Sequence, residues 1–424
     1  MWCIWGLFAV QAIVLWSIGW SNWGTPVIVF LLWGLGFAAY AFSAVKANFV
    51  SRKQVWVGGI LLRAGLFPLT PMLSEDIYRY MWDGWVQWNG MNPFSHAPAD
   101  SALALFRTEW SFLINNADVS TIYPAGAQLI FFILAWIGPT VVVFKTAWLI
   151  ADLSTAYIIH RLSHGSGSRA LLLYLWSPLL LMEVAWSGHF DPIGIAPMMG
   201  AVWVSGVISH PVLAALRVGS LLGISISVKF APLAVIPVVL RRYGALAVTG
   251  CLAIPILLYI PFSSVGAALF DGLRTYVDLW QFNAGGYLLL EQMVGHRDIS
   301  KWLGTIAVVV VVGWATVKKW PLARALFWSI GTALIVSPTV HPWYLLWVLP
   351  LACLSESRGW ILMTGTVFLS YAGRDVYLTS GVWPQPLWLT AIIHIPPLAL
   401  LAYDGWRGTR PQGLTCGKKI PEGK

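Results

Sequence analysis

The chain of 424 residues is 58% hydrophobic and only 10% charged, and its mean hydropathy is +0.72. This composition excludes a soluble globular protein and indicates a polytopic membrane protein. The net charge of +9 does not indicate nucleic-acid binding, because its meaning lies in how the charges are distributed between apolar segments. The four cysteines are scattered without metal spacing, so neither a metal site nor a disulfide framework is predicted.

Apolar segments near the roughly 20 residues that cross a bilayer recur along the whole chain, and they predict an all-α bundle of about 12–14 transmembrane helices. Residues 123–138 are expected to form a juxtamembrane or re-entrant helix on the outer side. The short, proline-interrupted segment 230–240 predicts a broken helix. The expected spans are 2–20, 25–45, 55–72, 140–160, 170–185, 192–208, 211–227, 230–240, 244–260, 301–317, 321–338, 342–354, 359–373 and 384–404.

The charges between these segments predict the orientation. Lys46, Arg52 and Lys53 follow the second span, so the positive-inside rule assigns this turn and the N-terminus to the cytoplasm. Segment 73–120 then lies outside, and its charges are mostly acidic: Glu75, Asp76, Asp83, Asp100, Glu109 and Asp118 against Arg79 and Arg107. The later basic groups fall inside, including a basic tail at 405–424 with Arg407, Arg410, Lys418, Lys419 and Lys424.

The acidic segment after the third span is the strongest candidate for chemistry. Ser74 is a candidate N-cap of a short interfacial helix. At helical spacing Asp76, Tyr80 and Asp83 share one face, and Arg79 lies beside them. Acidic residues beside a membrane span call for a functional explanation. The alternative is a charged interfacial helix that only caps the bundle.

Further polar groups follow later apolar segments. Glu183 and the turn with His189 and Asp191 suit a sugar or a cation, although a plain polar turn explains the pair His189 and Asp191 as well. Lys229 either snorkels to the headgroups or neutralises a phosphate, and His341 presents a similar choice. The aromatic and amide residues of loop 261–300, among them Trp280 and Asn283, suit carbohydrate.

Several of these segments together resemble the GT-C superfamily of membrane glycosyltransferases, and most closely its bacterial polyprenyl-phosphate-mannose-dependent enzymes. The likeness covers about residues 63–349, and SEDIYRYMWDG at 74–84 is its most specific part. The other segments are GMNPF at 90–94, IYP at 122–124, Glu183, GHFD at 188–191, Lys229 with Pro232, and SPTVHPWY at 337–344. Two departures are Ala125, where many relatives have a second proline, and Glu75 directly before Asp76.

This resemblance implies an inverting transferase with a large external first loop that carries juxtamembrane helices. It implies Asp76 as general base, a polyprenyl-phosphate sugar as donor, and no metal or other cofactor. A lipid phosphate is already a good leaving group, so the reaction needs one base and a cationic cradle. Glu75 and Asp83 remain alternatives as the base. Arg79, Lys229 and His341 are expected at the donor phosphate, and Glu75, Asp83, Tyr123, Glu183, His189, Asp191, Trp280 and Asn283 at the sugar or acceptor.

The expected organisation has four parts: an N-terminal hairpin at 1–54, a catalytic membrane module at 55–350, C-terminal helices at 351–404, and the cytoplasmic tail at 405–424. The external loops are expected at about 73–139, 185–192, 261–300 and 338–342. The predicted function is transfer of a sugar, which the resemblance implies to be mannose, to a hydroxyl on the external face of the cell membrane. The expected partners are the bilayer, the lipid-linked sugar and a glycolipid, glycan or protein acceptor. The alternatives are a transporter or lipid-linked sugar flippase, a ligase with a diphosphate donor, and a non-catalytic assembly factor.

Overall fold

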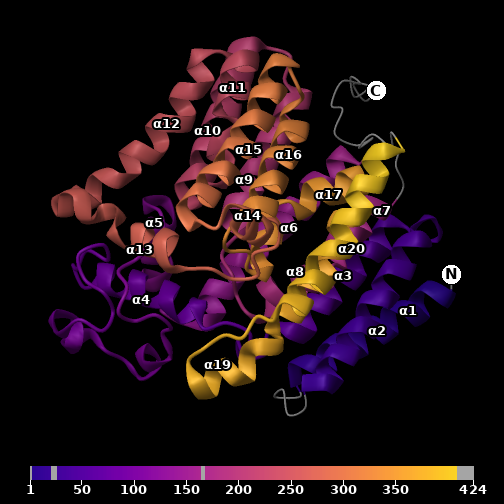
Figure 1. The fold of residues 1–424 in the computed structure, drawn as a ribbon, viewed down its shortest axis with the longest axis horizontal. Helices are drawn as coiled ribbons and strands as arrows, with labels where there is room; N and C mark the ends of the chain where they lie inside the picture. The colour runs from indigo at the N-terminus through magenta and orange to yellow at the C-terminus, as the bar shows by residue number, and fades with distance from the viewer. Residues whose placement is uncertain (1, 21–25, 164–167, 408–424) are drawn as a thin grey trace. The chain divides into compact units, whose positions relative to one another are not determined.

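The computed structural model describes residues 2–20, 26–163 and 168–407. Over this part of the chain the fold is helical, and extended pairing is limited to an isolated parallel bridge between Phe282 and Thr339 (Figure 1). Most of the predicted basic tail, from residue 408 onward, lies outside the described residues.

The described residues divide into two compact units. Unit 1 comprises 2–70, 154–186 and 281–407, and unit 2 comprises Pro71–Leu153 and Ser187–Trp280. Each unit joins segments that are distant in sequence, whereas the four predicted parts follow one another along the chain. Helix α6 (Val141–Leu162) contributes its first part to unit 2 and its end to unit 1.

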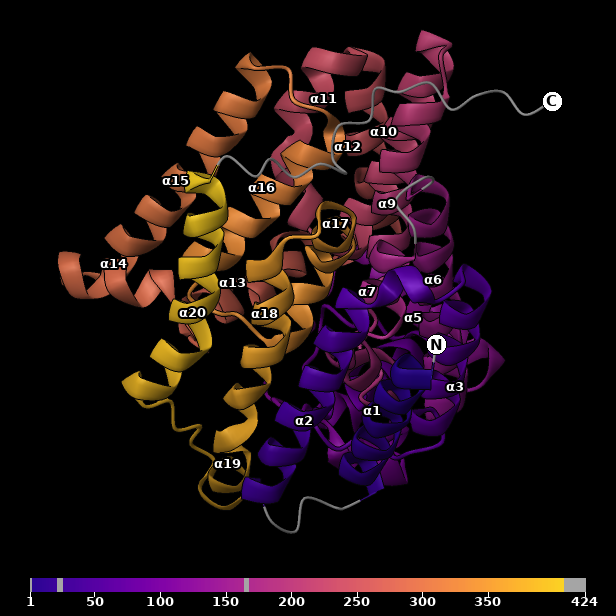
Figure 2. The ribbon, with the colours of Figure 1, turned by 90° about the vertical axis from the view of Figure 1, so that its right-hand side faces the viewer.

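Unit 1 begins with two apolar helices that pack against each other, α1 and α2. Their side-by-side arrangement is visible in both views (Figures 1 and 2). The helices of this unit are α1 (Trp2–Trp20), α2 (Pro26–Val45), η1 (Ala47–Phe49), α3 (Arg52–Leu66), α7 (Arg169–Leu175), α8 (Pro178–Leu180), the π-helix η4 (Leu181–Trp186), α14 (Gly286–Val294), α15 (Arg297–Val317), α16 (Leu322–Val336), η7 (Pro342–Trp347), α17 (Leu349–Ser355), α18 (Arg358–Thr366), η8 (Val367–Gly373), α19 (Arg374–Ser380) and α20 (Leu387–Trp406).

Unit 2 contains the predicted acidic segment and a group of apolar helices in which α10 packs against both α9 and α12 (Figure 1). Its helices are α4 (Asp76–Trp88), η2 (Ser101–Phe106), η3 (Glu109–Leu113), α5 (Ala125–Ile137), the start of α6, α9 (Pro192–Val207), α10 (Pro211–Val228), η5 (Ala231–Val235), α11 (Ile236–Tyr243), α12 (Ala245–Tyr259), η6 (Ile260–Phe270) and α13 (Asp271–Leu279).

The structure confirms a helical protein with several helices suited to a membrane. Seven helical segments in the described residues are long and apolar enough to cross a bilayer. Four shorter apolar helices accompany them, and the predicted total of 12–14 crossings stays a prediction. The short helix α5 has 13 residues, so at 1.5 Å per residue it reaches only about 20 Å of a roughly 30 Å hydrocarbon layer.

Prolines divide several of the predicted spans. Segment 170–185 is split into α7, α8 and η4, where Pro178 begins α8 and the Ser177 hydroxyl caps it. Segments 230–240 and 342–354 each consist of a 3₁₀ turn that contains a proline near its start, followed by an α-helix. Proline lacks an N–H donor and therefore fits best in the first turn of a helix. Helices α9, α12 and α20 nevertheless contain interior prolines.

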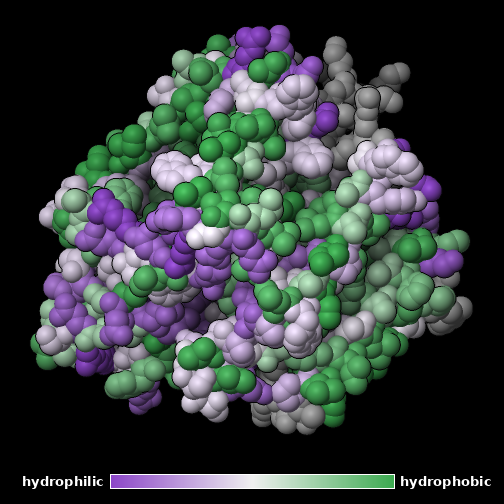
Figure 3. Space-filling view, viewed as in Figure 1, coloured by the Kyte–Doolittle hydropathy of each residue, from purple (hydrophilic) through white to green (hydrophobic). Residues whose placement is uncertain are grey.

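The surface of unit 2 separates apolar from polar side chains (Figure 3). Apolar groups cover α12, where Ile256 and Leu257 are 65% and 59% exposed, and hydrophilic groups gather over α13 and the loops around α4. Contiguous exposed apolar surface of this kind is unfavourable in water and favourable against lipid.

Glycines permit the close contact between α10 and α12. A Cβ atom at Gly219 would lie 2.3 Å from the carbonyl oxygen of Ala247, and one at Gly223 would lie 2.3 Å from that of Gly250. The two backbones therefore touch directly, as small residues allow between membrane helices.

We expect Gly219→Ala to destabilise the protein, because the new methyl group would overlap a backbone atom that cannot rotate away. Overpacking of this type costs about 1–3 kcal/mol, and thermal unfolding in detergent should show a lower Tm. Gly313→Ala is the matched control, since a Cβ at Gly313 meets nothing within 4 Å. Equal Tm values for the two variants would contradict the close contact.

Candidate active site

Helix α4 positions the predicted base at its first residue, Asp76. The expected N-cap, Ser74, is wrong by one position, because Glu75 occupies the cap and makes no side-chain hydrogen bond there. The Ser74 hydroxyl instead accepts a hydrogen bond from the Asp76 N–H at 3.2 Å. This start of the helix places a carboxylate near the positive end of the helix dipole.

The two oxygens of the Asp76 carboxylate make different hydrogen bonds. Oδ1 accepts a hydrogen bond from Asn115 Nδ2 at 2.8 Å. Oδ2 accepts a longer one from the Tyr80 hydroxyl at 3.5 Å and lies 3.8 Å from His189 Nδ1. The Tyr80 hydroxyl is also 3.3 Å from His189 Nδ1, so these three side chains form one polar cluster. Asn115 is not among the residues predicted from the sequence, and nothing in the sequence around it indicates this contact.

Burial raises the pKa of the Asp76 carboxyl above its ordinary value. The Asn115 hydrogen bond and the Lys229 charge oppose this effect, and the Asp191 charge adds to it. The side chain of Asp76 is still 18% exposed, whereas that of His189 is 1% exposed. A raised pKa together with partial access is typical of a carboxylate that exchanges protons during a reaction.

An ion pair lies in the same unit. Lys229 Nζ is 2.7 Å from Asp191 Oδ1, and the Asp191 side chain is fully buried while that of Lys229 is 24% exposed. The same ammonium lies 5.7 Å from the centre of the Phe190 ring. The structure thus shows Lys229 paired with a specific carboxylate. The Lys229 ammonium is therefore held by a buried carboxylate and remains partly accessible.

The turn that carries His189 and Asp191 approaches α4 closely. Gly188 has a φ of +77°, and a Cβ at this position would lie 2.5 Å from Ile77 Cδ1 and 3.2 Å from Lys145 Cγ. Only glycine accommodates both the left-handed conformation and this contact. Lys145, on α6, is 1% exposed and was also missed from the sequence. Its charge inside an apolar segment was the signal that could have identified it.

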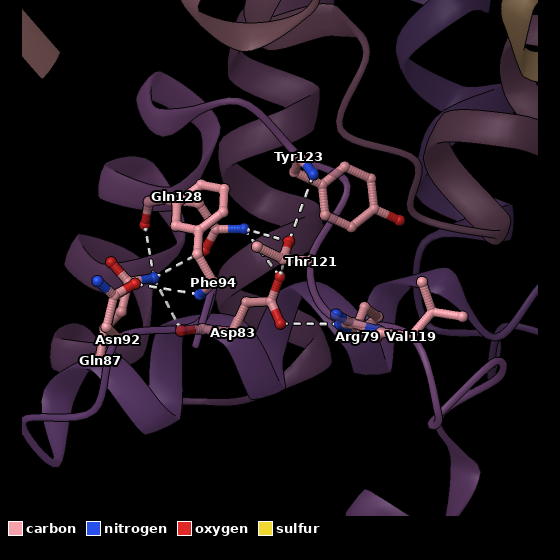
Figure 4. A network of polar contacts seen from close by, with 9 residues as sticks. All are labelled: Arg79, Asp83, Gln87, Asn92, Phe94, Val119, Thr121, Tyr123 and Gln128. Atoms are coloured by element: carbon pink, nitrogen blue, oxygen red, sulfur yellow. Dashed lines mark hydrogen bonds and ion pairs between the residues drawn. The ribbon is translucent and has the colours of Figure 1, made fainter. Parts of the chain in front are cut away.

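Arg79 and Asp83 belong to a separate buried network (Figure 4). Arg79 Nε is 2.8 Å from Asp83 Oδ1, and Arg79 Nη1 donates to the Val119 carbonyl at 2.9 Å. Asp83 Oδ2 accepts hydrogen bonds from Thr121 Oγ1 at 2.6 Å and Gln128 Nε2 at 2.8 Å. Asp83 is 1% exposed, so its oxygens are used in joining α4 to the following loop and to α5. This environment supports a structural role for Asp83 in place of the base or the sugar contact considered above.

Aromatic rings surround the inner side of the cluster. The ring of Tyr80 lies 5.2 Å from that of Tyr123, 5.1 Å from that of Phe131 and 4.9 Å from that of Phe190. Burial raises the pKa of both the Tyr80 and Tyr123 hydroxyls well above the ordinary value, so these groups remain protonated donors. The rings form an apolar wall beside Asp76, which strengthens electrostatic interactions there.

The other predicted residues have different surroundings. Glu183, in η4 of unit 1, is fully buried and accepts a hydrogen bond from the Tyr371 hydroxyl at 2.9 Å. Glu75 is partly exposed beside Asp76. Trp280 ends unit 2 with its ring 5.4 Å from that of Tyr276.

Two more predicted residues of unit 1 make specific contacts. The His341 ring is stacked between those of Phe282, at 4.6 Å, and Trp343, at 4.4 Å. Asn283, with a φ of +49°, donates to the Val340 carbonyl at 3.2 Å and its Oδ1 lies 3.0 Å from His394 Nε2. The side chain of Asn283 therefore stabilises the connection between two segments of unit 1.

The structure thus brings Asp76, Tyr123, His189, Asp191 and Lys229 together in unit 2, whereas Glu183, Asn283 and His341 belong to unit 1. Among the described residues, no group of three or more His, Cys, Asp or Glu side chains is arranged to hold a metal ion. Comparisons with protein-family models, curated proteins and solved structures find no match to this chain. The geometry of unit 2 is therefore the basis for any functional assignment.

We expect Asp83→Asn to lower stability strongly, because it removes one charge of a buried ion pair and leaves Arg79 uncompensated. Breaking such a pair costs about 3–5 kcal/mol, which thermal unfolding in detergent measures as a fall in Tm. Asp278→Asn, at an exposed position of α13, is the control. A Tm for Asp83→Asn equal to that of the control would contradict the structural role of Asp83.

Proposed function

We propose that this protein is an inverting glycosyltransferase that moves a sugar from a polyprenyl-phosphate donor to a hydroxyl acceptor. The observation that carries the proposal is Asp76, a carboxylate with a raised pKa, partial exposure and one oxygen without a short hydrogen bond. The likeness of segment 74–84 to the GT-C superfamily supports the assignment. Mannose is the first sugar to test, because it is the one that this likeness implies.

In the proposed reaction Asp76 acts as the general base. The acceptor oxygen attacks the anomeric carbon while its proton passes to Asp76 Oδ2, and the bond between that carbon and the phosphate oxygen breaks. The products are the glycoside with inverted configuration and the free polyprenyl phosphate. The phosphate departs as an anion, so no second carboxylate is needed to protonate the leaving group, in contrast to glycoside hydrolysis.

Lys229 is the proposed partner of the departing phosphate. Its ammonium is fixed by Asp191 at 2.7 Å and remains partly exposed, so it can share its charge with a phosphate oxygen while it stays oriented. Tyr123, whose ring lies 5.3 Å from that of Phe190, is the proposed contact for sugar or acceptor hydroxyls. His189, 1% exposed and 3.8 Å from Asp76 Oδ2, is the proposed inner partner of the base. Arg79 is less suited to this role, since two of its three nitrogens are bonded within the network of Asp83.

The charge pattern supports placing this chemistry on the non-cytoplasmic face of the cell membrane. Lys46, Arg52 and Lys53 flank the α2–α3 connection, and cytoplasmic turns are enriched in such residues. In this proposal α4 and its loop lie on the external side, where a lipid-linked sugar would be met in the outer leaflet. Helix α3 itself, with 15 residues, is not among the seven described helices that are long and apolar enough to cross a bilayer. Both termini are cytoplasmic in this proposal.

The most direct test incubates the purified protein with a panel of polyprenyl-phosphate sugars and a membrane lipid extract, and identifies the product by mass. A new glycosidic product with release of polyprenyl phosphate supports the proposal. Movement of the lipid-linked sugar across vesicles without a new bond would instead support the transporter or flippase alternative.

We expect Asp76→Asn to fold normally and to lose about 10²- to 10⁴-fold in transfer rate, the usual cost of removing a general base. The rate is measured with saturating donor and acceptor, and size-exclusion chromatography monitors folding. Asp118→Asn, at an exposed acid of the same loop, should retain the parental rate. Substantial turnover by Asp76→Asn would reject the assigned base.

We expect Lys229→Ala to weaken donor binding about tenfold or more, because a charge-assisted contact to the phosphate is lost. Since the substitution also leaves Asp191 buried without its cation, the double variant Lys229→Ala with Asp191→Asn separates binding from stability. Lys53→Ala, an exposed lysine in α3, is the control. An unchanged donor Kd in both Lys229 variants would exclude Lys229 from the phosphate site.

A further inference from the structure

Asn115 lies in the loop after α4, and its side chain contacts Asp76. Its Nδ2 donates to Asp76 Oδ1 at 2.8 Å across 39 positions of the chain. This is the shortest hydrogen bond that the Asp76 carboxylate makes, and it occupies Oδ1, whereas Oδ2 has its nearest partners at 3.5 and 3.8 Å. The two oxygens are therefore not equivalent.

The loop holds Asn115 in place from both sides. Ile114, directly before it, is buried, and Asn116, directly after it, adopts a left-handed conformation with a φ of +47°. The Val119 N–H donates to the Asn116 carbonyl at 3.1 Å, and the Val119 carbonyl accepts from Arg79 Nη1 at 2.9 Å. A left-handed asparagine is tolerated because its short polar side chain can bond locally.

Two contacts connect this loop to helix α4. Arg79 is one turn after Asp76 on the same helix, so the segment 115–119 is fastened to α4 at Asp76 through Asn115 and at Arg79 through Val119. Arg79 is itself fixed by Asp83, whose second oxygen binds Thr121 and Gln128. The buried network therefore fixes the loop, and the loop fixes the amide that touches Asp76.

We propose that Asn115 is a positioning residue for the general base, holding Asp76 through Oδ1 so that Oδ2 faces the acceptor hydroxyl. The catalytic part of this inference rests on the proposed function, and the contact itself does not. The amide nitrogen of Asn115 can donate a hydrogen bond but cannot accept one. It therefore stabilises the ionised Asp76 carboxylate, which is the form that a base requires. This effect opposes the burial of Asp76.

The test replaces Asn115 by leucine, which has a similar volume and no donor, and follows Asp76 by two independent measurements. The first is the pH profile of kcat/KM for transfer. The second is labelling of Asp76 by an apolar carbodiimide, which reacts with protonated carboxyl groups, read by peptide mass spectrometry across pH. The second readout does not require an active enzyme.

The sign of the expected shift follows from the hydrogen bond. Asp76 must be ionised to act as a base, so activity is lost as pH falls through its pKa. Without the amide donor the carboxylate is less stabilised and its pKa rises. In Asn115→Leu we therefore expect both the acidic limb of the profile and the labelling curve to move to higher pH by about one unit.

Two further variants make the result decisive. Asn115→Asp keeps the shape but places a second carboxylate beside Asp76, which should move both curves at least as far in the same direction. Asn89→Leu makes the same chemical change at an exposed asparagine that bonds the Trp85 carbonyl at the end of α4, and both curves should stay at their parental positions. Asn115→Asp also decides the matter if the leucine variant fails to fold.

The possible outcomes separate the two proposals. Unmoved labelling curves in folded Asn115 variants would overturn the positioning role. Shifted labelling together with the absence of any transfer by the parental protein would reject the glycosyltransferase function and support the contact. Shifted labelling with an unmoved activity limb would overturn the part of the inference that concerns catalysis, since Asp76 would then not be the titrating base.

Discussion

A buried carboxylate is stable only if its charge is neutralised and its oxygens accept hydrogen bonds. Asp83, which is 1% exposed, meets both conditions through Arg79, Thr121 and Gln128. These partners come from α4, the loop after η3 and α5. The contacts that stabilise the Asp83 carboxylate therefore join three segments of unit 2. The position of Asn115, and through it that of Asp76, depends on these same contacts.

The two aspartates of α4 illustrate how environment separates function from structure within one short helix. Asp83 has both oxygens bonded at 2.8 Å or less. Asp76, two turns earlier, has one oxygen bonded at 2.8 Å and the other at 3.5 Å. A fully bonded carboxylate cannot take up a proton without losing a partner, whereas a partly bonded one can. The same residue type thus serves as an anchor at one position and as the proposed base at the other.

The local charge balance suits the proposed chemistry. Asp191 carries a negative charge that is compensated by Lys229, and the fully buried His189 lies beside both Tyr80 and Asp76. The aromatic rings of Tyr123 and Phe190 pack edge to face in the same cluster, 5.3 Å apart. Cations and donors of this kind stabilise a developing phosphate charge most effectively where water is largely excluded.

The sequence by itself predicted a helical protein with apolar helices suited to a membrane, most helix positions and the acidic segment that begins α4, because hydrophobicity, proline and charge act over a few neighbouring residues. For example, α10 spans Pro211–Val228 where the sequence predicted 211–227. Tertiary structure alone decided which aspartate of α4 has both oxygens in short hydrogen bonds. It also decided that Asn115 bonds Asp76, that Glu183 bonds Tyr371 and that His341 is stacked between two rings. Local pattern encodes burial along the chain, whereas contacts such as Asn115 with Asp76 and Glu183 with Tyr371 depend on packing between segments that are 39 and 188 residues apart.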